Sequence, residues 1–180
     1  MEKEKVLADI QSKIWFLHDE KKFKEISRTA SKLFTILGFP RKESKVVGKY
    51  VSDAYFFYDK AGEQDKKGNK VKREYYFQKV LEDQIKIRKL LGENILAAYY
   101  ENKWWVKFHY RNYFGQFPYM FSQQLIKYKG YNFTIPIKTT YYLIKAGLEG
   151  HNKRKRDIAA KYLEKYWKIT LKHMKDKIQY

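Results

Sequence analysis

Apolar residues recur at intervals of three or four along most of this chain, and that spacing limits what the chain can fold into. Between residues 3 and 37 they keep two registers, separated by the charged residues 18–22. The first register holds Val6, Ile10, Ile14 and Leu17, and the second holds Phe23, Ile26, Ala30, Leu33 and Leu37. Such spacing gathers apolar side chains on one face of a helix. We therefore expect either two helices or one long helix here, ended by Gly38 and Pro40.

A polar segment follows the next predicted helix, which runs from about Glu43 to Lys60. Residues 60–73 read KAGEQDKKGNKVKR, and the glycines in this segment favour a loop. One interpretation makes it the turn of a β-hairpin with strands YFFYDK and KVKREYYF. The other makes it a link to a helix over 74–91, where apolar residues again follow helical spacing. We prefer the helix.

The rest of the chain also favours helices. Pro118 begins a short predicted helix that Gly130 closes, and a short β-prone stretch covers 131–136. A helix then leads to Gly147, and the last predicted helix covers about 153–178. We expect a mainly α, compact multi-helix domain with room for a small β-hairpin or short strands. The alternative is an α+β fold with a mixed sheet.

The 180 residues predict a single domain with three regions. Residues 1–38 form an N-terminal helical region and residues 149–180 a C-terminal basic helix. Between them, residues 39–148 form a core region that is aromatic-rich and basic. The chain has 17 Tyr, 12 Phe and 4 Trp, whose rings suit polar interfaces as well as cores.

The formal net charge is +19, with 39 basic and 20 acidic residues. A surplus of this size attracts polyanions, and neutralising phosphates releases counterions. The absence of cysteine excludes disulfides, iron–sulfur clusters and cysteine-ligated zinc. No apolar run is long enough for a membrane span, and the N-terminal residues lack the pattern of a signal peptide. We expect an intracellular, cytoplasmic protein, which includes a viral or mobile-element protein packaged in a particle.

The acidic residues are unevenly distributed. Residues 102–148 hold seven basic residues, 14 aromatic residues and no Asp or Glu. A surface that contacts phosphates and bases would have this composition, because a carboxylate there would repel the ligand. A core segment with few charges is the competing interpretation, but seven cations suit a core poorly.

Three cations at intervals of four stand at the start of this acid-free segment. They are Lys103, Lys107 and Arg111. They share a face, opposite Trp104, whether the segment is a helix or a strand. The neighbouring rings that we expect to stack on bases or sugars are Trp105, Tyr110 and Tyr113.

A second basic cluster consists of Lys153, Arg154, Lys155 and Arg156 at a predicted helix start. Four successive cations cannot all point into a core. A solvated turn is the simplest interpretation, and contact with phosphates is the one we favour.

These features predict a non-enzymatic protein that binds DNA or RNA mainly through the phosphate backbone. It would be a self-associating nucleoprotein or coat subunit, or a subunit of a ribonucleoprotein complex, with no cofactor. A protein-binding adaptor or inhibitor is a further alternative.

An enzymatic alternative depends on five residues. Glu101 and Lys103 form an acid-x-lysine pair in a β-prone run, Asp83 lies upstream, and Gln124 and Tyr128 are four apart on a predicted helix. This pattern resembles the PD-(D/E)xK nuclease superfamily, although the Pro-Asp of the name is absent. The resemblance implies that Asp83 and Glu101 hold Mg²⁺, that Lys103 is catalytic and that Gln124 and Tyr128 support them. Oxygen ligands suit Mg²⁺, which would stabilise charge at the phosphate.

Overall fold

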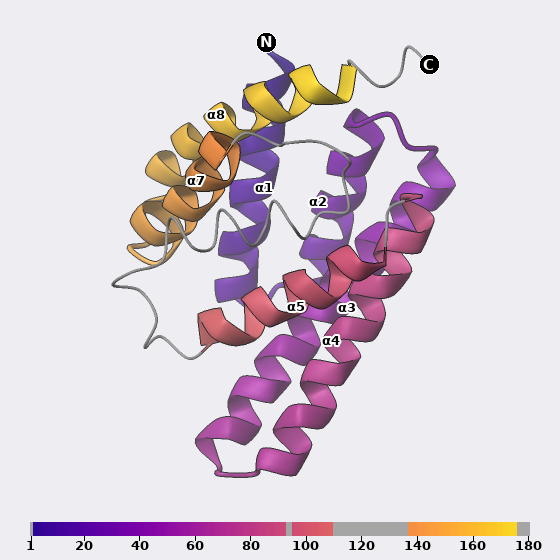
Figure 1. Ribbon diagram of the computed structural model, residues 1–180, viewed down its shortest axis with the longest axis vertical. Coiled ribbons are helices and arrows are strands. Elements are labelled where there is room, and N and C mark those ends of the chain that lie inside the picture. Colours follow the sequence, from indigo (N-terminus) through magenta and orange to yellow (C-terminus); the bar gives the residue numbers. More distant parts are fainter. Residues whose placement is uncertain (1, 93–94, 110–136, 176–180) are drawn as a thin grey trace.

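The computed structural model describes residues 2–92, 95–109 and 137–175, and within these ranges the chain is helical with no strand (Figure 1). The predicted mainly α fold is confirmed. The helices are α1 (Lys3–Asp19), α2 (Phe23–Ile36), α3 (Arg41–Lys66), α4 (Lys70–Leu90), α5 (Leu96–His109), α7 (Ile137–Lys145) and α8 (Arg156–Lys175). A π-helical turn, Ala146–His151, continues α7. None of these helices is long and apolar enough to cross a membrane.

The N-terminal region forms two helices rather than one. The break lies at residues 20–22, where Lys21 has a φ of +55°, in the left-handed region that ends a helix. Gly38, with a φ of +101°, terminates α2 as expected, because glycine adopts this conformation without steric cost. Pro40 then directly precedes α3.

The predicted loop over residues 60–73 is wrong, and so is the hairpin alternative. Helix α3 continues to Lys66 and α4 already begins at Lys70. Lys, Glu and Gln are good helix formers, so the polar composition of this segment did not argue against a helix. Gly68 makes the turn with a φ of +70°, and the Asn69 side chain caps α4 by accepting a hydrogen bond from the Lys72 backbone N–H at 3.1 Å.

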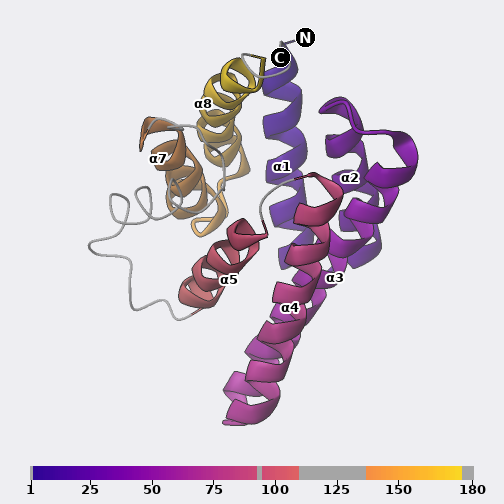
Figure 2. The same ribbon diagram turned by 45° about the vertical axis from the view of Figure 1, so that its right-hand side comes forward.

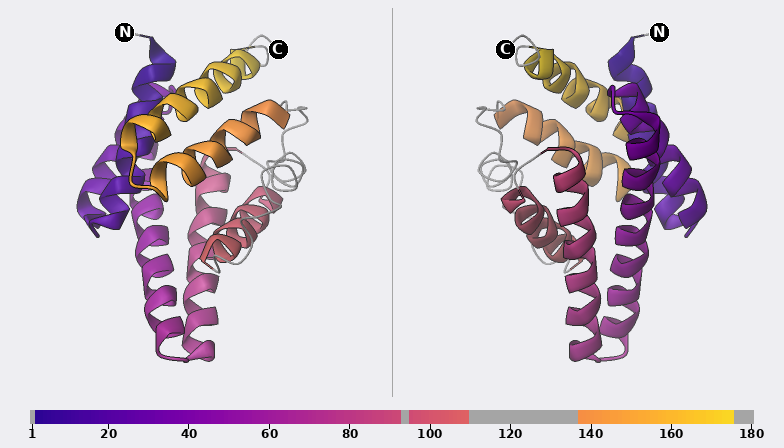
Figure 3. Two further views of the ribbon diagram at one scale, coloured as in Figure 1. Left: turned by 90° about the vertical axis from the view of Figure 1, so that its left-hand side faces the viewer. Right: turned by 90° about the vertical axis from the view of Figure 1, so that its right-hand side faces the viewer.

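The helices pack in a chain of neighbours. Helix α3 lies between α2 and α4, α1 contacts α2 and α8, α7 lies along α8, and α5 packs on α4. The far end of the α3–α4 hairpin extends beyond the other helices in every view (Figures 1, 2 and 3). Buried side chains of α1, α2, α7 and α8 form the main core, which includes Leu7, Ile14, Ile26, Leu33, Leu143, Leu163 and Trp167.

The predictions for the second half are partly confirmed. The helix expected to reach Gly147 is α7 with its π-helical turn, and the last helix begins at Arg156 rather than at residue 153. The helix predicted from Pro118 and the strand predicted over 131–136 lie outside the described residues.

Two glycines allow close approaches between elements. A Cβ atom on Gly48 of α3 would lie 2.1 Å from Ser31 Oγ and 2.4 Å from the carbonyl oxygen of Ser27, both on α2. A Cβ atom on Gly150 would lie 2.4 Å from the Cα of Ala159 on α8. Real Cβ atoms do not come this close to other atoms, so each crossing depends on glycine.

Polar contacts join α1 to the C-terminal part of the chain. Trp167 Nε1 donates to Gln11 Oε1 at 2.8 Å, and His151 Nε2 lies 3.1 Å from the Asp19 carboxylate. These pairs hold segments that are more than 130 residues apart in the sequence. They fix α8 and the π-helical turn against α1.

The pH dependence of stability tests the contact between Asp19 and His151. Burial raises the pKa of the Asp19 carboxyl, but the hydrogen bond from His151 and nearby positive charges outweigh it, so the pKa lies below its ordinary value of 3.8. Such a group adds stability above the ordinary pKa that is lost as pH falls through the lowered one. Denaturant unfolding should therefore depend less on pH in D19N than in the wild type, between about pH 5 and about pH 2. D9N, at an exposed acid of α1, should keep the wild-type slope; equal slopes for D19N and wild type would contradict the contact.

Candidate functional site

Helices α2 and α3 face each other through small residues. Gly48 lies against Ser27 and Ser31, and Ser52 Oγ donates to the carbonyl oxygen of Phe23 at 2.7 Å. Because rising numbers on α3 meet falling numbers on α2, the two helices are antiparallel. The contact fixes which sides of the two helices lie together.

A row of cations runs beside this contact on each helix. Each residue of a helix is rotated by about 100° from the one before it, so Lys24, Arg28 and Lys32 lie beside the contact line of α2. Lys45 and Lys49 hold the same position on α3, and Lys42 is close to it. In two antiparallel helices that face each other, equal rotations lead to the same side of the pair. We call this side the α2–α3 basic face, and it consists of Lys24, Arg28, Lys32, Lys42, Lys45 and Lys49.

The cations of the α2–α3 basic face are not held in ion pairs with other described residues. All six side chains are exposed, and within the described part of the chain none of them forms an ion pair. By contrast, Lys60, Arg73 and Lys79 on the outer part of the α3–α4 hairpin each hold an acid. Lys66, Lys67, Lys70 and Lys72 at the α3–α4 turn are also exposed and have no ion pair among the described residues. The α2–α3 basic face differs from them in that its cations form two aligned rows.

The acids nearest in sequence to this face are Glu25 and Glu43, which directly follow Lys24 and Lys42. Asp53, four residues after Lys49, is half-buried. Burial raises the pKa of its carboxyl, and the negative charge of Asp83 raises it further, against the opposite effect of Lys49 and Lys86.

A second row of cations follows the outer side of α8. Lys161, Lys165, Lys168 and Lys172 are exposed, and their spacing of four, three and four residues aligns them on one face. The opposite face buries Leu163, Tyr166 and Trp167 in the core. The Lys165 ammonium also lies 5.5 Å from the ring centroid of Tyr142 and 5.8 Å from that of Tyr162. This side of the molecule combines cations with partly exposed rings.

The basic cluster predicted from the sequence precedes this row. The side chains of Lys153, Arg154, Lys155 and Arg156 are all exposed. Lys153 pairs with Glu149, and within the described residues the other three have no ion pair. They lie in the turn before α8 and at its first residue. They therefore precede the basic strip that Lys161, Lys165, Lys168 and Lys172 form along α8.

The opening residues of the acid-free segment are divided between solvent and core. Lys103 is exposed on α5, and Lys107 belongs to the same helix. The Trp105 ring centroid lies 4.8 Å from that of Tyr55 and 5.5 Å from that of Tyr58, so this partly buried ring packs against α3. Tyr110, Arg111 and Tyr113 lie outside the described residues.

The acids of the nuclease pattern lie in different ion pairs. Asp83 is 3% exposed and accepts from Lys86 Nζ at 2.8 Å, whereas Glu101 is paired with Arg88. Asp83 and Arg88 point about 140° apart on α4. Asp83 and Glu101, the partner of Arg88, therefore do not meet on one face of that helix.

The acid-x-lysine pair also has an unexpected geometry. Residues two apart share a face in a strand, but α5 is a helix and places Glu101 and Lys103 about 200° apart. Gln124 and Tyr128 lie outside the described residues. Among the described residues no group of three or more acids and histidines is placed to hold a metal ion.

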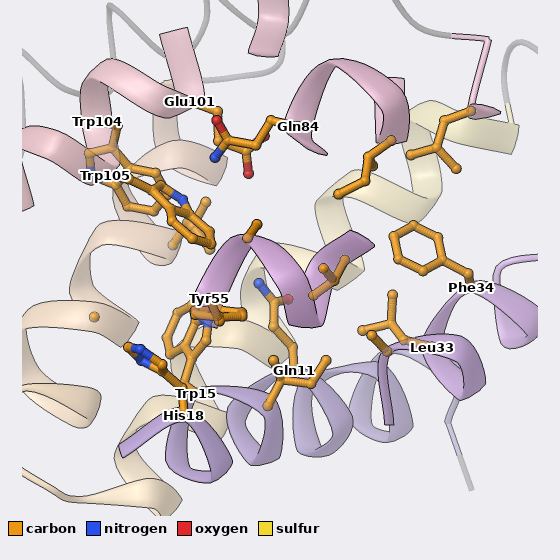
Figure 4. A pocket seen from close by; sticks show the side chains of 18 of the residues that line it. Gln11, Trp15, His18, Leu33, Phe34, Tyr55, Gln84, Glu101, Trp104 and Trp105 are labelled. Carbon is orange, nitrogen blue, oxygen red and sulfur yellow. The ribbon is translucent and has the colours of Figure 1, made fainter. Parts of the chain in front are cut away.

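A cavity of about 360 Å³ lies where the described helices converge. Figure 4 shows Glu101 and Gln84 on one wall, with Trp104 and Trp105 beside them and Gln11, Trp15 and His18 across the space. Burial raises the pKa of the Tyr55 hydroxyl, which lines this cavity, and the charge of Glu101 adds to the effect. The cavity is mainly apolar with a few polar groups.

Sequence reasoning missed both the α2–α3 basic face and the cavity. The spacing of Lys24, Arg28 and Lys32 was visible as a helical row, but only the contact at Gly48 places Lys45 and Lys49 beside it.

Comparisons with protein-family models, with curated proteins and with solved structures found no match to this chain.

Proposed function

We propose that this protein binds nucleic acid through the phosphate backbone and without catalysis. The observation that carries the proposal is the α2–α3 basic face, whose six exposed cations form no ion pair with any described residue. The net charge of +19 supports the same conclusion for the whole chain. Contacts of this kind set affinity and position but do not read the base sequence, so the proposal covers DNA and RNA equally.

The dimensions of the face suit several phosphates at once. Residues four apart on a helix are separated by about 6 Å along its axis, so Lys24, Arg28 and Lys32 span about 12 Å. The lysines of α3 form a second, antiparallel row. The two rows together present six cations to one strand of nucleic acid, and each phosphate that they neutralise releases counterions.

The basic strip of α8 supports a structural role. It is separate from the α2–α3 basic face and has rings beside its lysines, among them Tyr142 and Tyr162. Rings next to cations are the arrangement that single-stranded nucleic acid favours, because bases stack on them. A chain with two separate basic surfaces suits a subunit that coats or gathers nucleic acid in a larger assembly.

The salt dependence of binding tests the proposal. In the variant R28Q/K32Q/K45Q/K49Q, the slope of log K against log salt concentration on duplex DNA should become shallower by about 3 to 4. The matched control K66Q/K67Q/K70Q/K72Q removes the same charge from exposed lysines at the α3–α4 turn and should change the slope by less than about 1. Fluorescence anisotropy over a salt series measures both.

Two results would contradict the proposal. One is a wild-type protein that retains neither DNA nor RNA at low salt, which is what the adaptor alternative predicts. The other is equal loss of binding in the variant and the control, which would mean that net charge alone acts.

Prolonged incubation of the nucleic acid with protein and Mg²⁺ tests the nuclease alternative, because cleavage that E101A abolishes would favour it.

A further inference from the structure

We infer that the central cavity is a binding site for a small planar heterocycle with a hydrogen-bond donor next to an acceptor, held by the amide of Gln84. The volume of about 360 Å³ falls in the range of ligand pockets, which is about 300–1,000 Å³. The inference is independent of nucleic-acid binding, because the cavity lies between the helices and the cations lie on their outer sides.

Among the described residues, Gln84 is the amide of the cavity wall that lacks hydrogen-bond partners. Its side chain on α4 is 3% exposed, and neither its amide oxygen nor its amide nitrogen has a hydrogen-bond partner in the part of the chain described. A buried amide without partners costs free energy, and a ligand that satisfies both atoms recovers it. The amide therefore favours a ligand with two complementary groups.

Three other polar side chains of the wall already have partners. Gln11 accepts from Trp167 Nε1 at 2.8 Å, and Glu101 pairs with Arg88. His18 Nε2 lies 2.8 Å from Asp59 Oδ1. Gln84 is thus the amide in the wall whose hydrogen-bonding capacity is unused, and it determines what the site recognises.

The remaining wall determines the shape of the ligand. All four tryptophans of the chain line the cavity, together with Tyr55, Tyr58 and Phe34. Flat rings pack best against a flat ligand. An amide that offers a donor beside an acceptor pairs in a bidentate way with the edge of an adenine-type base, where an amino group adjoins a ring nitrogen.

The fluorescence of the four tryptophans reports binding directly. We expect adenine to change the emission of the wild-type protein in a saturable way. In Q84M, which keeps the length of the side chain but loses both hydrogen-bonding groups, adenine should bind at least about tenfold more weakly. Q78M, at an exposed glutamine of the same helix, should bind adenine as the wild type does.

A second probe keeps the test valid if Q84M folds poorly. Purine lacks the amino group, so it should bind the wild-type protein at least about tenfold more weakly than adenine. The inference is overturned if millimolar adenine leaves the emission unchanged, if purine binds as tightly as adenine, or if folded Q84M binds adenine as tightly as the wild type.

Discussion

The variant G48A is expected to lose roughly 2–3 kcal/mol of unfolding free energy. An added Cβ would meet Ser31 Oγ at 2.1 Å and the Ser27 carbonyl oxygen at 2.4 Å, so α2 and α3 must move apart. Alanine is a better helix former than glycine by about 1 kcal/mol, and this gain offsets only part of the loss. Urea unfolding followed by circular dichroism measures the change.

Two companion variants separate the steric effect from other causes. K49A alters the neighbouring, exposed residue and should stay within about 0.5 kcal/mol of the wild type. In G48A/S31A the serine oxygen is gone but the Ser27 carbonyl remains, so stability should return only in part. A G48A protein as stable as the wild type would contradict the close contact and, with it, the shared α2–α3 basic face.

Loss of the Arg88 guanidinium is expected to have an effect of similar size. In R88M the free energy of unfolding should fall by about 2–3 kcal/mol at neutral pH. Arg88 is 11% exposed and Glu101 27% exposed at the cavity wall, so the carboxylate that remains would have lost its cation in a mostly apolar environment.

The double variant identifies the cause of this loss. R88M/E101Q removes the stranded charge and should recover at least half of the stability that R88M loses. If the double variant is as unstable as R88M, the loss comes from other contacts of Arg88 and not from its ion pair with Glu101. The measurement is the same denaturant titration, analysed as a double-mutant cycle.

The helical pattern was sufficient to predict the fold class. Amphipathic spacing predicted α1, α2, the early part of α3, α4 and α8, because burial of one face gives a periodic signal. It failed over 60–73, where both helices continue without burying an apolar stripe. The turn is confined to the residues around Gly68, and Gly62 lies within α3. A polar segment that extends away from the bundle has the composition of a loop and can still be helical.

The candidate surfaces were predictable only where they are local in sequence. Lys153 to Arg156 are adjacent, so their exposure followed from composition alone. The α2–α3 basic face depends on Gly48 meeting Ser31, and the cavity gathers side chains from positions as distant as Gln11 and Thr170. The helix at α5 also separates Glu101 from Lys103, which a strand would have kept together. Tertiary contacts of this kind leave no periodic trace in the sequence.

The contact of α1 with α8 has a consequence for how the chain folds. Helices α1 to α4 each pack on a neighbour in the sequence, so their contacts close short loops and form early. The partner of Gln11 lies 156 residues away, and closing so large a loop costs more entropy. During synthesis α1 is made well before α8, so part of its apolar face stays uncovered until α8 has been made. Until α8 arrives, that face is the surface through which a nascent chain of this protein would aggregate or recruit a chaperone.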